Sequence, residues 1–296
     1  MRVLGLFLVI MAHCGVSGFL FELRNFDVTM LIFVSAFVFA IGYRGDWKDY
    51  FFRRLRRILF PVWIFLAVYF ASNVASGQSF DINTIIRSFL MVDGIGYVWI
   101  FRVMITLALI NPLLYKLTNN MNGYVMLFIV VGLMLGNHFL EYLVSGLEGS
   151  ASSIIIFFVS YTVSYGTISM VGMKWRKLSK AEKLIYFIVF VAIFVGFGYL
   201  RNWPSLQAYK YPPKEYYSCY GLIWSIVIYE FLTLIKIKGN AIINWIGSHT
   251  LYIYLGHIVM LRVLHIGPWY VLYGCVLAGS IILAYLYSLL KGAVRR

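Results

Sequence analysis

Long apolar runs separated by short polar connectors extend along almost the whole chain. The runs lie near residues 3–21, 26–43, 58–76, 98–115, 124–143, 153–173, 184–200, 217–235, 242–264 and 268–290. Most have close to the ~20 residues that a helix needs to cross the hydrocarbon core of a bilayer, and their apolar residues are continuous rather than alternating as in a barrel strand. The pattern therefore predicts about ten membrane-spanning helices and argues against a β-barrel.

Composition points to a membrane protein and excludes two other classes. The 296 residues are 62% hydrophobic and 12% charged, whereas soluble proteins have about 25% charged residues. Too little polar surface remains to cover a soluble globule, and a disordered chain is excluded for the same reason. We expect an all-α, polytopic integral membrane bundle that forms a single domain over residues 1–296, with no appended soluble domain.

The distribution of basic residues predicts the orientation of this bundle. If the N-terminus is cytoplasmic, 18 of the 25 lysines and arginines fall on the cytoplasmic side, and Arg102 lies inside a span. The other six fall in outer loops: Arg24, Arg87, Arg201, Lys210, Lys214 and Arg262. An excess of this kind marks the cytoplasmic side of membrane proteins. We therefore assign the net charge of +14 to the membrane rather than to a nucleic-acid partner, and expect both termini in the cytoplasm.

His13 is an ionisable residue within the first apolar run. It follows Arg2 by eleven residues, close to three helical turns, so both side chains share one helix face about 16 Å apart along the axis. A buried imidazole is held neutral and can take a proton from a hydroxyl nucleophile, which makes His13 a candidate general base. A histidine hydrogen-bonded to a neighbouring helix is an equally good interpretation from position alone. Cys14 points about 100° away on the same helix and is not assigned a role.

A dense arginine cluster precedes the third run. Arg53 and Arg57 are spaced i,i+4 and Arg54 and Arg57 are spaced i,i+3, so their guanidinium groups share a helix face suited to bidentate phosphate contacts. A phosphorylated cofactor is a suitable ligand, although topogenic charge or contact with anionic lipid explains the cluster equally well. The three cysteines lack metal-type spacing, so no metal site is predicted.

Glu141 and Glu230 also lie within apolar runs. Glu141 follows His138 by three residues at the outer end of the fifth run, where an acid–base pair is conceivable but extension of both side chains to the interface is the better explanation. Glu230 lies nearer the cytoplasmic end of the eighth run. We interpret it as a structural acid neutralised by a basic residue.

Several segments resemble one family in order and spacing. They are Arg2 followed after ten residues by His13, then FDVTMLIFVSAFVFA, FFRRLRRILFP, YVWIFRVMITLALINPLLY, KYPPKEYYSCYGLIWS and IGSHTLYIYLGH. Together they resemble the acyltransferase-3 family of integral-membrane acyltransferases, which includes bacterial O-acetyltransferases of cell-surface polysaccharides. The resemblance extends from about residue 2 to 290.

This resemblance implies transfer of an acyl group, commonly acetyl, from cytoplasmic acyl-CoA to a carbohydrate hydroxyl on or facing the outer side of the inner (plasma) membrane. By position, His13 corresponds to the catalytic base, and Arg2, Arg54 and Arg57 belong to the acyl-CoA site. Acyl-CoA is then a substrate, with no permanently bound cofactor. The expected partners are acyl-CoA, a carbohydrate acceptor and the bilayer.

Other residues are weaker candidates for contact with substrate or support of the site. They are Arg53, Trp99 in the fourth run, Tyr216 and Tyr217 at an expected outer mouth, and His257 in the ninth run. His257 is suited to orienting a substrate or tuning His13, and equally to a structural bond with a backbone carbonyl. Larger O-antigen members of the family carry a tryptophan and a glutamate shortly before the position of Gly221. This chain has Tyr216, Tyr217, Ser218, Cys219 and Tyr220 there, so a carboxylate partner for His13 is not expected from that segment.

Two other classes of function compete with an enzyme. A polysaccharide exporter would also have polar groups along a passage, but it has no need for a base aligned with a cytoplasmic phosphate site. A membrane scaffold leaves His13 unexplained, because ionisable groups within the bilayer are costly. We therefore favour the acyltransferase.

Overall fold

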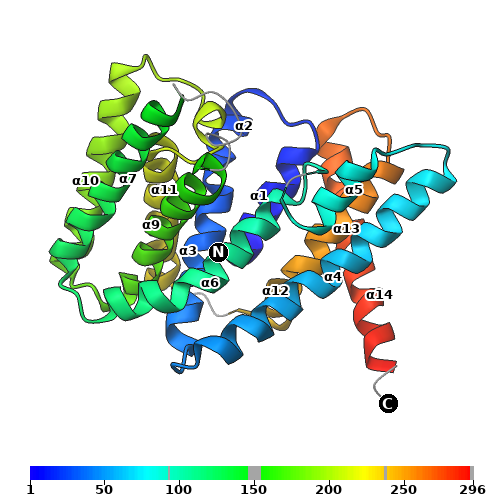
Figure 1. The fold of residues 1–296 in the computed structure, drawn as a ribbon, viewed down its shortest axis with the longest axis horizontal. Helices are drawn as coiled ribbons and strands as arrows, with labels where there is room; N and C mark the ends of the chain where they lie inside the picture. The colour runs from blue at the N-terminus through cyan, green and yellow to red at the C-terminus, as the bar shows by residue number, and fades with distance from the viewer. Residues whose placement is uncertain (93, 146–154, 237–238, 294–296) are drawn as a thin grey trace. The chain divides into compact units, whose positions relative to one another are not determined.

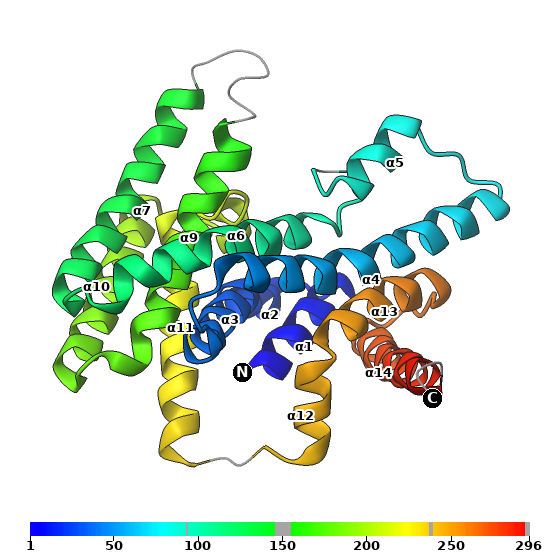
Figure 2. The same cartoon turned by 60° about the horizontal axis from the view of Figure 1, so that its bottom comes forward.

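A computed structural model describes residues 1–92, 94–145, 155–236 and 239–293. Helices account for most of these residues, and this part of the chain contains no strand, only an isolated bridge between Lys210 and Pro213. The helices form two compact units, shown in Figure 1 and, turned, in Figure 2. The first unit comprises residues 1–5, 17–47 and 109–238, and the second comprises 6–16, 48–108 and 239–296.

The first unit contains most of the middle of the chain. Its helices are α2 (Gly18–Leu23), α3 (Asp27–Gly42), α7 (Gly123–Ser145), α9 (Tyr161–Lys174), α10 (Lys180–Leu200) and α11 (Glu215–Leu234), and α6 (Trp99–Asn119) contributes its second half. Helix α3 packs against α9 and α11, α10 packs against α11, and α7 packs against α9. A Cβ atom at Gly172 would collide with the backbone of Phe33, and one at Gly221 with the side chain of Thr29. These two glycines therefore permit the close approach of α9 and α11 to α3.

The second unit combines helices from the first third and the end of the chain. They are α4 (Trp47–Ala75), α5 (Ile82–Phe89), α12 (Ala241–Ser248), α13 (Thr250–Val263) and α14 (Trp269–Ala293), with most of α1 (Arg2–His13) and the first half of α6. Its core packs α4 against the connection to α6 and against α13 through the buried side chains Ile58, Val62, Leu66, Phe70, Met91, Val98, Phe101 and Leu255. Helices α13 and α14 also pack along each other.

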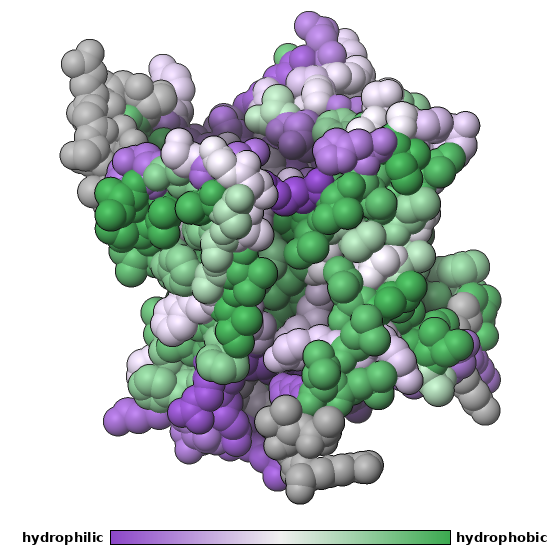
Figure 3. All heavy atoms as spheres, turned by 90° about the vertical axis from the view of Figure 1, so that its right-hand side faces the viewer, coloured by the Kyte–Doolittle hydropathy of each residue, from purple (hydrophilic) through white to green (hydrophobic). Residues whose placement is uncertain are grey.

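The expected helical membrane bundle is confirmed. Among the described residues, seven helical segments are long and apolar enough to cross a membrane, and α1 and α13 are shorter apolar helices. Figure 3 shows hydrophobic side chains in a broad band between hydrophilic ends on the face that carries α4, α13 and α14. A band of this kind suits contact with lipid. The total of ten spans stays a prediction.

The first apolar run is not one helix, contrary to the prediction for residues 3–21. Helix α1 ends at His13, and α2 begins at Gly18 and joins α3 in a single candidate span, Gly18–Gly42. Gly15, just after α1, and Gly18, the first residue of α2, have φ angles of 80° and 63°. This left-handed conformation interrupts a continuous helix, and glycine adopts it without steric cost. The continuous hydropathy of the run gave no indication of this break. Because of the break, His13 lies at a helix terminus.

Candidate active site

His13 is the last residue of α1, and its side chain is exposed. The expectation of a buried imidazole is therefore wrong, because α1 stops at this residue instead of continuing through a packed bundle. The position has its own electrostatic consequence, since the carbonyl groups at a helix C-terminus favour a positive charge nearby. The imidazolium that forms when His13 accepts a proton is stabilised by that end of α1.

Two rings of the second unit lie beside His13. The ring centroids of His13 and Tyr97 are 5.4 Å apart, and those of His13 and His257 are 5.2 Å apart. Tyr97 and His257 are themselves 6.2 Å apart, nearly perpendicular. The end of α1, the connection before α6 and the middle of α13 thus bring three proton-bearing side chains together.

The geometry around His257 defines its hydrogen-bonding state. Its side chain is 0% exposed, and its Nδ1 lies against the backbone carbonyl of Tyr254. A carbonyl oxygen only accepts, so Nδ1 carries the hydrogen, and Nε2 of the neutral ring is left as an acceptor. Nε2 has no hydrogen-bond partner among the described residues. An open acceptor therefore lies within the group of rings around His13.

Hydrogen bonds fix the connection that carries Tyr97. The Tyr254 hydroxyl donates to the carbonyl of Tyr97 at 3.2 Å, and Arg102 donates to the carbonyl of Val92 at 2.8 Å. Tyr254 thus holds both the backbone of Tyr97 and, through its own carbonyl, the ring of His257. Sequence reasoning missed Tyr97 and Tyr254, because aromatic residues are common throughout this chain and carry no distinguishing signal.

The arginines of the α4 cluster differ in whether they form an ion pair with a carboxylate. Arg53 pairs with Asp49 at 2.7 Å and is exposed, so part of its charge is compensated. Arg54 is half-buried and Arg57 is exposed, and neither pairs with a carboxylate among the described residues. Two guanidinium groups one turn apart are therefore available to an anion such as a phosphate.

The remaining predicted site residues are placed as follows. Arg2 is the first residue of α1 and His13 is the last, so the predicted common helix is confirmed. Trp99 begins α6 and is half-buried. Tyr216 and Tyr217 are 3% and 0% exposed in the first unit, so they are packed residues rather than free rings at a mouth. Tyr216 stacks on Phe194 at 4.9 Å.

A second group of polar side chains is buried in the first unit. Asp27 accepts from Arg24 at 2.7 Å and from Lys210 at 3.1 Å, and all three side chains are buried. Sequence reasoning missed this group, treating Arg24 and Lys210 as outer loop charges. The available signal was Asp27 itself, a carboxylate at the start of a long apolar run.

The other buried acids of the first unit are also paired. Glu215 contacts Arg201 at 3.4 Å and His138 at 3.0 Å. Glu141 is buried and lies 3.5 Å from Lys214, so the expected extension of its side chain to the interface is wrong. Each of these acids therefore has a basic partner of its own.

Comparison with known proteins identifies the family. A family model described as an acyltransferase domain matches residues 1–289. The chain belongs to this family. It is a membrane acyltransferase, and the exporter and scaffold interpretations are set aside. Searches of curated proteins and of solved structures found no match.

Proposed function

We propose that this acyltransferase moves an acyl group, in the first instance acetyl, from cytoplasmic acyl-CoA to a hydroxyl group of a cell-surface or lipid-linked carbohydrate, and that it works in the plasma membrane. The observation that supports this most directly is the grouping of His13 with Tyr97 and with the open acceptor of His257 in a chain of this family. Within the second unit, Arg54 and Arg57 are proposed to bind the phosphates of CoA.

In the proposed reaction, His13 acts as the general base. It takes the proton of the acceptor hydroxyl while the hydroxyl oxygen attacks the carbonyl carbon of the thioester. Collapse of the tetrahedral intermediate breaks the carbon–sulfur bond and forms the ester. The CoA thiolate then receives the proton from His13, so the enzyme returns to its starting state with CoA and the acylated sugar as products.

His257 is proposed to position His13. Once protonated, His13 has two N–H donors, and Nε2 of His257 is an acceptor without another partner among the described residues. A hydrogen bond between them would orient the imidazolium with its other N–H toward the departing sulfur. The Tyr254 carbonyl keeps the hydrogen of His257 on Nδ1, which keeps Nε2 available.

The test is a transfer assay with purified protein in detergent or nanodiscs. The protein is incubated with radiolabelled acetyl-CoA and candidate glycans, and labelled carbohydrate is measured together with released CoA. We expect label in the carbohydrate with one CoA released per ester formed. Intact binding of acetyl-CoA without transfer to any hydroxyl acceptor would contradict the proposed function.

A further inference from the structure

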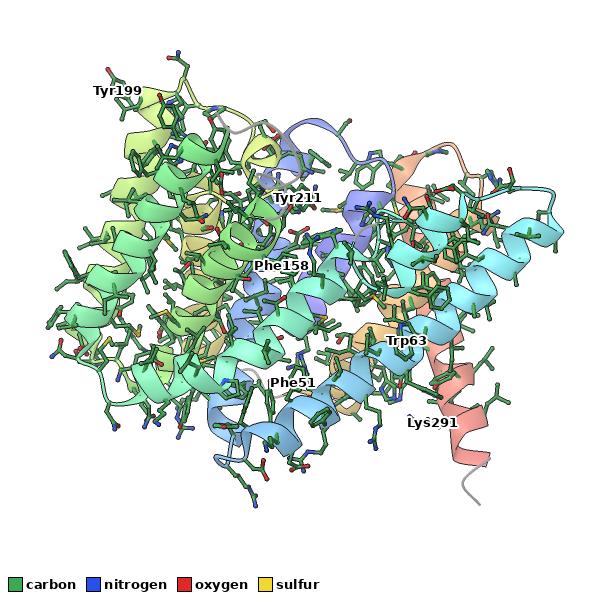
Figure 4. The ribbon with its side chains drawn as sticks, in the orientation of Figure 1. Phe51, Trp63, Phe158, Tyr199, Tyr211 and Lys291 are labelled. Carbon is green, nitrogen blue, oxygen red and sulfur yellow. The ribbon has the colours of Figure 1, made fainter. Side chains whose placement is uncertain are left out.

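The buried group around Asp27 is built where separate segments of the first unit meet. Arg24 lies just before α3, Asp27 begins α3, and Lys210 lies in the connection between α10 and α11. The three side chains are 3%, 1% and 3% exposed. Tyr211, which is labelled in Figure 4, follows Lys210 in the same connection and is exposed. The group is therefore adjacent in sequence to a residue that reaches the surface.

The charges of this group do not balance. Arg24 and Lys210 share the single carboxylate of Asp27, whereas Arg201 has Glu215 and Lys214 has Glu141. Burial lowers the pKa of the Lys210 ammonium, and Asp27, opposed by Arg24, offsets this only in part. An excess positive charge that is removed from water is costly unless a further anion accompanies it.

Two polar atoms of these side chains lack hydrogen-bond partners. Among the described residues, Arg24 Nε and the Tyr165 hydroxyl have none. The rings of Tyr211 and Tyr217 lie 5.7 Å and 5.8 Å from Lys210 Nζ. Buried polar groups normally have partners, so unsatisfied donors beside an excess cation are suited to a negatively charged ligand.

We propose that Arg24, Lys210 and the tyrosines Tyr165, Tyr211 and Tyr217 bind the carbohydrate acceptor through a negatively charged group, either a carboxylate of an acidic sugar or a phosphate of a lipid-linked sugar. We call these five residues the anion-binding cluster. The cations hold the negative group, the tyrosine hydroxyls donate to it or to sugar hydroxyls, and the exposed ring of Tyr211 offers a face to the sugar. This inference rests on the proposed function, because it names the class of acceptor.

The first test uses Tyr165→Phe. The hydroxyl has no hydrogen-bond partner among the described residues, so a purely structural cluster predicts an unchanged or higher melting temperature and unchanged kinetics. If the hydroxyl contacts the acceptor, its loss raises the KM for the acceptor by about 2- to 12-fold and leaves the KM for acyl-CoA unchanged. Tyr186→Phe is the matched control, because the Tyr186 hydroxyl donates to the Gly123 carbonyl at 2.7 Å. It should lower stability without changing the acceptor KM.

The second test changes the charge. Lys210→Gln leaves the Arg24–Asp27 pair and removes the excess cation, so we expect at least about a tenfold loss of kcat/KM for an acidic acceptor and little change for its neutral analogue. Three acceptors are compared: a uronate-containing glycan, the same glycan with its carboxylates reduced to alcohols, and a lipid-phosphate-linked sugar. The acceptor whose advantage disappears identifies the anion. Equal losses for charged and neutral acceptors would overturn the proposal.

Direct binding separates this inference from the proposed function. His13→Ala protein without acyl-CoA is titrated with the charged glycan and with the lipid-linked sugar, and heat or fluorescence is measured. Binding that is weakened when Lys210→Gln is added supports the cluster even if no acyl transfer is ever detected. Transfer by the wild type, combined with equal glycan binding by His13→Ala proteins with and without Lys210→Gln, would reject the cluster and leave the proposed function standing.

Discussion

At the scale of single residues, the site depends on whether each imidazole can accept a proton from a substrate or only a hydrogen bond from a neighbouring side chain. His257 has a defined hydrogen position because a backbone carbonyl occupies its Nδ1, whereas His13 is exposed at the end of α1. The exposed ring can meet a substrate, and the buried ring can only support it. This difference supports the proposal that His13 transfers the proton and that His257 positions it.

His13→Ala is expected to abolish acyl transfer while leaving the fold and acyl-CoA binding intact. General-base catalysis contributes about 10²- to 10⁴-fold, so the loss should appear in turnover rather than in donor affinity. His13→Asn should not restore activity, because an amide cannot accept and release a proton near neutral pH. Transfer rate, CoA affinity and melting temperature are measured on both variants. An active His13→Asn enzyme would remove His13 as the base.

His257 should tolerate replacement by an acceptor but not by a hydrocarbon. His257→Gln keeps a side-chain oxygen that can accept from His13, so we expect it to retain more activity than His257→Phe. We expect His257→Phe to lower kcat about tenfold, the equivalent of one lost hydrogen bond of about 1.4 kcal/mol, with little change in either KM. If the two variants have equal kcat values and differ only in melting temperature, His257 is a structural residue.

At the scale of elements, the sequence predicted the helices better than their ends. Continuous apolar runs located the bundle, because a helix must satisfy its own backbone in lipid. The break between α1 and α2 was missed because single glycines within a long apolar run change its average hydropathy little, and the positive φ angles of Gly15 and Gly18 are visible only in the structure. The displacement of His13 from a buried to an exposed position follows from that break.

Helix α4 carries the arginines that we predict to bind the acyl donor, acyl-CoA. Arg54→Ala and Arg57→Ala should each weaken acyl-CoA binding by about one to two decades, because each removes charge-assisted contacts worth roughly 1.5 to 3 kcal/mol. Lysine should restore binding only in part, because it lacks the planar fork of arginine. Arg53→Ala is the matched control, since Arg53 is already paired with Asp49. Calorimetry on folded protein decides, and unchanged affinity in both test variants would leave Arg54 and Arg57 as topogenic charge.

At the scale of the whole molecule, ion pairs between residues distant in sequence could not be predicted from the sequence alone. Lys210 meets Asp27 across 183 positions, and Lys183 meets Glu230 across 47. The interpretation of Glu230 as a neutralised structural acid is confirmed by its 2.8 Å contact with Lys183. By contrast, four of the six bases assigned to the outer side form ion pairs with carboxylates, which a count of charges treats as free surface groups.

These pairs leave the prediction of topology unchanged. The orientation depends on the number of lysines and arginines on each side and little on nearby acids, so both termini should lie on the cytoplasmic side. Within the second unit, Figure 1 draws the first turns of α4 and the C-terminal end of α14 toward the same edge, as this orientation requires. At the C-terminus, a reporter that functions only in the cytoplasm should be active. Between α10 and α11, a reporter that functions only outside should be active. A C-terminal fusion that is active only outside would place Arg54 and Arg57 away from cytoplasmic acyl-CoA and would overturn the donor site.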